Sequence, residues 1–274
     1  MELYFRWPNK RSLSQFALWT VLFLNLGATV YFWIIGSKYY LANPDGGNIY
    51  IAAGRLAGLI GQIGLLTQLV LISRFPWVER PYGFDRLNRF HRWMGYILIF
   101  LLFSHPVLLI IGGVQQYSQS WWWQLADYLA NKPYVLLSFF GLLLFIFVVI
   151  LSISIVRRKM RYETWYFVHL LTYVALMLAF LHQLNTGDLR DKVALWYWLC
   201  LNFVVFTVVV LWRWLRPLIM WLYHDFHVDR VVQETPDVWS FYLSGRRLGS
   251  FRFQAGQYAN LRFLTKKLWW QSHP

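Results

Sequence analysis

Six apolar segments, each long enough to cross a lipid bilayer, constrain this chain more than any other feature. A helix needs about 20 consecutive apolar residues to span the hydrocarbon core. Six stretches reach this length: 13–35, 49–73, 91–112, 133–156, 164–183 and 193–215. Only 14% of the residues are charged, whereas a soluble domain carries about 25%. The sequence therefore predicts an all-α integral membrane bundle of six transmembrane helices.

The distribution of lysine and arginine predicts the orientation of these helices. One side carries fourteen cations, at the N-terminus, around the connections after the second and fourth helices and at the end of the sixth helix. They are Arg6, Lys10, Arg11, Arg74, Arg80, Arg86, Arg89, Arg92, Arg157, Arg158, Lys159, Arg161, Arg213 and Arg216. The opposite side carries four. Because cytoplasmic loops are enriched in Lys and Arg, we expect a multi-pass protein of the cell membrane with both termini in the cytoplasm. The net charge of +14 makes membrane lipids with anionic headgroups the expected partners, and not nucleic acid.

Four histidines lie as two pairs in the third and fifth segments. His91 and His105 are 14 residues apart, and His169 and His182 are 13 apart. At 1.5 Å of rise per residue, each spacing corresponds to about 20 Å along a helix. In the predicted topology both helices enter from the cytoplasm, so His91 and His169 share an inner level and His105 and His182 an outer level. This pattern favours two stacked metal centres, one toward each face of the membrane.

The chemistry of imidazole indicates that these centres are haems. Histidine is a common axial ligand of haem iron, and a second imidazole from a facing helix fills the sixth position. A proton path would normally add intramembrane Asp or Glu, and none lies well inside the six segments. The single cysteine, Cys200, excludes iron–sulfur clusters within this chain. We therefore expect two b-type haems.

The spacing within the fifth segment raises a geometric question. Fourteen residues return to within about 40° of the starting face of an ideal helix, but thirteen residues leave the second ring about 140° away. A π-bulge, a bend or the reach of the side chains can correct this difference. The four histidines also have a structural interpretation, as residues that form hydrogen bonds between helices.

The residues around the histidines resemble the ferric reductase-like transmembrane family, which includes the NADPH oxidases. The matching stretches are Asp85 to Gly95 with Ser104-His105, and Tyr162 to His169 with Leu181-His182-Gln183. The family has the same spacings between its histidines. By this resemblance His91 and His169 bind the inner haem iron, and His105 and His182 bind the outer haem iron.

Arg55 is a further candidate, for the outer-haem or acceptor site. It lies in an otherwise uncharged part of the second segment, where a guanidinium needs a counter-charge or must reach the headgroups. In similar oxidases an arginine at this place lies beside the outer haem, where the acceptor is reduced. Those oxidases often carry another histidine four residues after the outer ligand, and here that residue is Leu109. The acceptor therefore stays open between a ferric chelate, dioxygen and a quinone.

Two weaker patterns accompany these residues. Trp121-Trp122-Trp123 is typical of an aromatic belt at a membrane surface. A row of small residues in the second segment allows either close approach of another helix or room for a flat macrocycle. Its members are Gly54, Gly58, Gly61 and Gly64.

After Pro217 the sequence changes to short strands with turns. Strands are expected at 227–232, 238–243 and 257–263. This part resembles the opening of the flavin-binding β-barrel of ferredoxin-reductase-type enzymes. It divides the chain into a six-helix haem-binding domain, 1–217, and an incomplete FAD-binding β-barrel, 218–274. His224 and His227, at the junction, are expected to be solvated.

The resemblance implies how FAD is bound. It places FAD at Gln257, Tyr258, His273 and Pro274. The family's Ser or Thr after the His-Pro pair is absent here, as is the nicotinamide domain that would follow. We therefore expect a fragment of a longer reductase that holds haem but binds FAD poorly.

The expected function is that of a transmembrane b-type cytochrome oxidoreductase. The resemblance implies that cytosolic NAD(P)H and FAD supply electrons, which pass through two bis-histidine haems to an acceptor on the outer face. Two other functions stay open. One is a non-catalytic haem subunit that a separate soluble flavoprotein reductase serves, and the other is a histidine-based proton or metal carrier.

Overall fold

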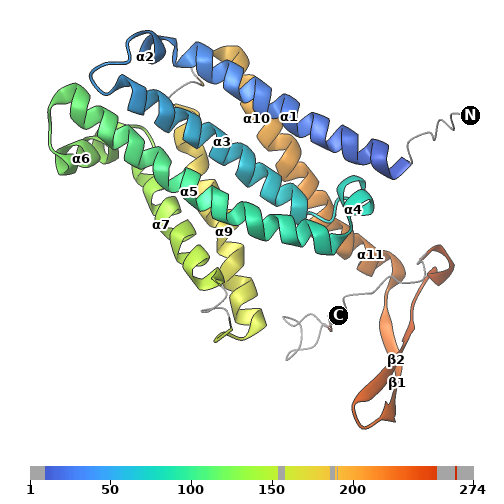
Figure 1. Cartoon of the computed structure of the whole chain (residues 1–274). Coiled ribbons are helices and arrows are strands. Elements are labelled where there is room, and N and C mark those ends of the chain that lie inside the picture. Colours follow the sequence, from blue (N-terminus) through green and yellow to red (C-terminus); the bar gives the residue numbers. More distant parts are fainter. Residues whose placement is uncertain (1–9, 154–157, 186–188, 190, 252–262, 264–274) are drawn as a thin grey trace, which may run out of the picture. The chain divides into compact units, whose positions relative to one another are not determined.

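The computed structural model of the chain contains the six predicted helices (Figure 1). It describes residues 10–153, 158–185, 189, 191–251 and 263. Within these residues six helices are long and apolar enough to cross a membrane. They are α1 (Lys10–Gly36), α3 (Asn48–Ile72), α5 (Phe84–Tyr117), α7 (Val135–Ser152), α9 (Tyr162–Gln183) and a sixth helix that begins with α10 (Lys192–Val209). This is a multi-pass membrane protein.

The bounds of the helices differ from the expected ones mainly in the third and fourth. The third helix, α5, begins at Phe84 and not at His91, because Gly83, with a φ of 78°, ends the preceding α4 (Pro76–Tyr82). The fourth, α7, ends at Ser152. Two more short helices, α2 (Lys38–Ala42) and α6 (Trp121–Asn131), lie in connections between the long ones.

Two pairs of helices pack side by side along their lengths, α3 with α5 and α7 with α9 (Figure 1). The glycine row of α3 faces α5. A Cβ on Gly61 would lie 3.3 Å from Leu102, and a Cβ on Gly54 would lie 3.1 Å from Leu109. The row therefore allows close approach of α5, which was one of the two interpretations of this pattern.

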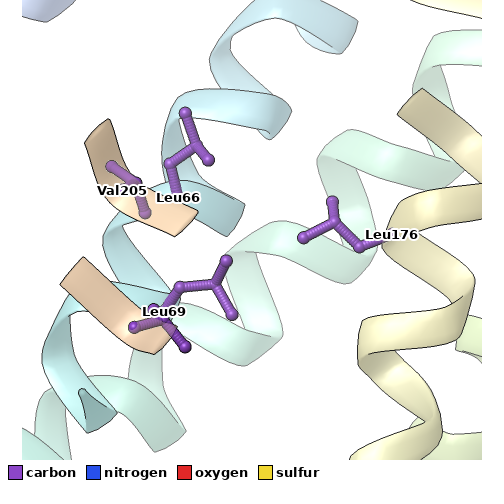
Figure 2. Packing of buried hydrophobic residues seen from close by; sticks show 5 residues of the cluster. Leu66, Leu69, Leu176 and Val205 are labelled. Carbon is purple, nitrogen blue, oxygen red and sulfur yellow. The ribbon is translucent and has the colours of Figure 1, made fainter. Parts of the chain in front are cut away.

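Apolar side chains join these pairs to the sixth helix. Figure 2 shows Leu66 and Leu69 of α3 near Val205 of α10, with Leu176 of α9 in the same cluster. Elsewhere the long helices expose large apolar side chains, among them Phe16, Phe100 and Phe203 at 71%, 72% and 72%. Such surfaces are typical of helices that face lipid.

A buried polar network also links three of the helices. The Nε2 group of Gln62 on α3 donates to Oδ1 of Asn202 on α10 at 2.8 Å. The Gln62 Oε1 accepts from Gln183 of α9 at 3.3 Å, and the Gln183 Oε1 accepts from the Trp198 indole of α10 at 2.8 Å. Polar side chains of this kind hold transmembrane helices together, because lipid offers them no other partner.

Residues from Val210 onward form a second compact unit. It contains a π-helical turn, η2 (Val210–Leu215), then α11 (Arg216–His224) and a two-stranded antiparallel sheet. The strands are β1 (His227–Thr235) and β2 (Val238–Ser244), followed by a short 3₁₀ turn, η3 (Leu248–Ser250). The first two expected strands are thus confirmed. The FAD residues Gln257, Tyr258, His273 and Pro274 lie outside the described residues.

The expectation that His224 is solvated was wrong. Its side chain is 2% exposed and packs against Phe226 and Phe251, with ring centres 5.1 and 5.5 Å away. The chain after β2 returns to the end of α11, where the N–H of Arg246 donates to the His224 carbonyl and Nδ1–H of His224 donates to the Arg246 carbonyl. His227 is exposed, as expected.

Candidate functional site

The structure brings the four intramembrane histidines together as two pairs. His91 of α5 lies beside His169 of α9, with ring centres 6.1 Å apart and ring planes at 73°. His105 and His182, on the same two helices, have ring centres 6.3 Å apart and planes at 44°. The pairs therefore form two levels, separated by about 20 Å along the helices.

The histidines of α9 face those of α5 without a π-bulge in α9. Residues Tyr162–Gln183 form one continuous α-helix, and within the described residues a π-helical turn lies instead at Val210–Leu215. A bend or the reach of the side chains therefore accommodates the spacing of 13 residues. Pro106, directly after His105, offers one source of a bend in α5, because proline lacks the N–H group of a regular helix.

Hydrogen bonds define which ring nitrogen is available at the His105–His182 pair. The Nδ1 of His105 lies 2.8 Å from the carbonyl oxygen of Gly54, and Nδ1 of His182 contacts the carbonyl oxygen of Ala179. A carbonyl oxygen only accepts, so both Nδ1 atoms carry the hydrogen. In a neutral ring Nε2 is then the nitrogen without a hydrogen, which is the form that binds a metal.

His169, in the His91–His169 pair, also forms a hydrogen bond through Nδ1. The Nδ1 of His169 lies 3.1 Å from Oγ of Ser152, the last residue of α7. The same oxygen lies 3.2 Å from the indole nitrogen of Trp165 and 2.8 Å from the carbonyl oxygen of Val148. The indole can only donate, and the carbonyl takes the serine hydrogen, so His169 also donates through Nδ1.

The geometry of both pairs fits an axially ligated macrocyclic metal. A bond between a metal and an imidazole nitrogen is about 2 Å long, so two imidazoles on opposite sides of one metal have ring centres about 6 Å apart. Among the described residues, no group of three or more His, Cys, Asp or Glu side chains is placed to hold a metal ion. Two imidazoles alone do not complete a zinc or copper site. A haem supplies the four remaining nitrogen ligands from its own ring, so this donor set suits haem iron.

Gly58 is part of the surroundings of His105. A Cβ at this position would lie 2.5 Å from Nδ1 and 2.8 Å from Cε1 of the His105 ring. Real Cβ atoms do not approach so closely, so the ring position depends on the missing side chain. The sequence pattern left open whether the glycine row allows close approach of a helix or makes room for a macrocycle, and at Gly58 the missing side chain gives space to the His105 ring.

Arg55 follows Gly54, the residue whose carbonyl oxygen accepts the hydrogen bond from His105. Its guanidinium lies over the Tyr40 ring, 4.5 Å from the ring centre, and donates to the Gly36 carbonyl at 3.3 Å. The side chain is partly exposed. Arg55 is therefore positioned by the end of α1 and by α2, within one residue of the hydrogen bond that holds His105.

Tyr128 is a residue that the sequence did not single out. From α6, its hydroxyl donates to the carbonyl oxygen of Leu109 at 3.2 Å. Burial, followed by the nearby Tyr117 and Asp127, raises the pKa of Tyr128 to about 12, and the charge of Arg55 acts in the opposite direction. The hydroxyl is thus protonated at neutral pH and available as a donor.

Gln68 and Gln183 were likewise not predicted from the sequence as site residues. The Gln68 amide donates to the main-chain carbonyl of His91 at 2.8 Å, and so links α3 to α5 beside the His91–His169 pair. Gln183 follows His182 and connects α9 to the buried network with Gln62. Interhelical hydrogen bonds of this kind depend on how each helix is rotated, which residue types alone do not reveal.

Comparison with known families agrees with these features. Residues 57–180 match the family described as ferric reductase like transmembrane component. This span begins within α3 and contains His91, His105 and His169, and it ends just before His182. No curated protein matches the chain. Residues 57–180 are therefore a ferric reductase-like transmembrane domain.

Proposed function

We propose that the chain carries electrons across the cell membrane through two b-type haems. His91 and His169 hold one haem, and His105 and His182 hold the other. The observation that carries this proposal is the pairing of four imidazoles on α5 and α9, with ring centres 6.1 and 6.3 Å apart. Three of these rings have Nδ1 engaged in a hydrogen bond, so Nε2 is the nitrogen that a metal would bind.

Each part of the chain has a definite role in this proposal. Bound haem supplies one-electron redox chemistry at its iron. The four imidazoles would hold the two haem irons, one pair to each iron, and would so keep small ligands away from them. Carbonyl oxygens of Gly54 and Ala179 and the hydroxyl of Ser152 orient three of the rings. The apolar helices keep water away from both levels.

The direction of transfer follows from the charge of the connecting segments. Lys and Arg are concentrated at the end of the bundle that holds His91 and His169, so this pair lies toward the cytoplasm. FAD, reduced by NAD(P)H, is the proposed cytoplasmic donor, or a soluble flavoprotein reductase takes its place. The acceptor at the His105–His182 end is a ferric chelate, dioxygen or a quinone, and Arg55 is the proposed contact for it.

Reconstituted vesicles test transfer across the membrane. Haem-loaded protein is placed in sealed liposomes that contain ferricyanide, and dithionite, which does not cross the bilayer, is added outside. We expect trapped ferricyanide to be reduced by the wild-type protein and not by His105→Ala or His169→Ala. The exposed His227→Ala serves as the control and keeps the wild-type rate.

The outcome separates this function from a histidine-based carrier. A carrier lacks visible haem absorbance and dissipates a proton or metal gradient across the same vesicles. Haem-containing protein that leaves ferricyanide oxidised would contradict electron transfer across the membrane.

A further inference from the structure

The hydroxyl of Ser152 has every hydrogen-bonding position in use. A serine hydroxyl has one hydrogen and two acceptor lone pairs. In this chain the hydrogen goes to the Val148 carbonyl at 2.8 Å, and the lone pairs accept from His169 Nδ1 at 3.1 Å and Trp165 Nε1 at 3.2 Å. Ser152 therefore connects α7 to two side chains of α9.

Ordinary helix geometry accounts for only one of these three contacts. Serines in helices often donate to a carbonyl in the preceding turn. Ser138 of the same helix does so at 2.8 Å, to Val135. The contacts of Ser152 with His169 and Trp165 are additional, and Trp165 also stacks on the His169 ring, with ring centres 5.2 Å apart and planes at 26°.

The other pair uses a different kind of acceptor. His105 and His182 donate through Nδ1 to main-chain carbonyl oxygens, of Gly54 and Ala179. Substitution of a side chain does not remove a carbonyl. At His169 the acceptor is a side-chain oxygen, and a second donor, the Trp165 indole, shares it. The strength of the Ser152 oxygen as an acceptor for His169 therefore depends on the side chains of Ser152 and Trp165.

We infer that Ser152 and Trp165 act as positioning residues that tune the reduction potential of the haem held by His91 and His169. This inference rests on the proposed haem function. A good acceptor at Nδ1–H places more negative charge on the imidazole, which stabilises the oxidised metal and lowers its potential. The Trp165 N–H draws charge from the Ser152 oxygen and so weakens it as an acceptor for His169.

Two substitutions should shift the potential in opposite directions. Ser152→Ala removes the acceptor of His169, so the potential of this haem rises. Trp165→Phe keeps an aromatic ring but removes the competing N–H donor, so the potential falls. We expect the change for Ser152→Ala to be about tenfold in the reduction equilibrium, which is about 59 mV for one electron. The change for Trp165→Phe is smaller.

Spectroelectrochemical titration of the haem-loaded chain at fixed pH tests this inference. Each substitution is also made together with His182→Ala, so that the remaining haem is the one at the His91–His169 pair. Ser138→Ala is the matched control, because it removes a hydroxyl from the same helix without a histidine contact. Ser152→Thr retains the hydroxyl and should restore a potential near that of the wild type.

Opposite shifts for Ser152→Ala and Trp165→Phe, with Ser138→Ala unchanged, support the inference. Unchanged potentials, shifts in the same direction or an equal shift for Ser138→Ala overturn it. If Ser152→Ala loses the haem, the Trp165→Phe variant tests the inference instead. An unchanged or raised potential in Trp165→Phe contradicts it. Absence of haem from the wild-type chain would instead refute the proposed function.

Discussion

The two histidine pairs share the same two helices but are held in different ways. At the His105–His182 pair, both rings donate to carbonyl oxygens, and the His105 ring packs on Gly58. At the other pair, His169 donates to Ser152 and stacks on Trp165. The His105–His182 pair is thus held by main-chain carbonyl groups and by the space that a glycine leaves. His169 of the other pair is held by side chains.

This difference predicts different sensitivities to substitution. An environment that depends on close backbone approach fails when a larger side chain is introduced nearby. One that depends on side-chain hydrogen bonds responds to substitutions that remove a donor or an acceptor. Substitutions near each pair should therefore differ in which haem is lost and by how much.

The largest effect is expected when an imidazole is removed. His182→Ala should lose the haem of the His105–His182 pair and keep the other, so that the haem content falls from two to one per chain. Haem is counted per polypeptide after purification. Simultaneous loss of both haems from a protein that remains folded would contradict the assignment of two separate levels.

Gly58→Ala should act on one pair only. The new Cβ would lie 2.5 Å from His105 Nδ1 and would displace a ring that is hydrogen-bonded to Gly54. Such overpacking costs about 1–3 kcal/mol. We expect partial loss of the haem at the His105–His182 pair, measured from the haem content. Gly27→Ala is the control, because a Cβ at Gly27 meets no atom within 4 Å. Equal losses in the two variants would refute a specific role for Gly58.

Removing the amide of Asn202 should weaken the bundle near His182. Asn202→Leu leaves the buried Nε2 of Gln62 without its acceptor, which costs about 1–3 kcal/mol. Because Gln62 also contacts Gln183, next to His182, we expect lower thermal stability and a preferential loss of that haem. Asn131→Ala removes an exposed amide that bonds to Asp127 and should leave the melting temperature nearly unchanged. A similar decrease for both would argue against the network.

The smallest effect is expected for Tyr128→Phe. Loss of the hydrogen bond to Leu109 costs about 0.5–1.5 kcal/mol. Burial and the nearby Tyr117 and Asp127 raise the pKa of Tyr128 from 10.0 to about 12, so the folded state keeps a proton that the unfolded state loses. This contribution to stability is present below pH 10 and is lost as the pH rises to 12. Unfolding measured across this range should show a weaker decline in Tyr128→Phe than in the wild type.

The helices were predictable because the bilayer requires long apolar segments, and six such segments are evident in the sequence. The histidine spacings also indicated which rings would share a level. The contacts of Ser152, Trp165 and Gln183 were not predictable, because they depend on the rotation of each helix about its axis. A polar residue in an apolar segment does not by itself reveal which neighbour it faces.

The incorrect expectation for His224 has a different cause. Its position in a connecting segment suggested contact with solvent, since connections generally run over the surface. Burial of this ring results from the return of the chain after β2, which brings Phe251 onto it. The sequence predicted the strands β1 and β2, but not where the chain after β2 would pack.

The central claim is that two pairs of histidines each hold one haem. A dithionite-reduced minus oxidised visible spectrum of the detergent-purified, haem-supplied chain, with haem counted per polypeptide, tests it most directly. Two low-spin b-type haems per chain are expected, because two imidazoles would bind each iron. A chain that is folded and supplied with haem but retains none would contradict the claim and favour a histidine-based carrier.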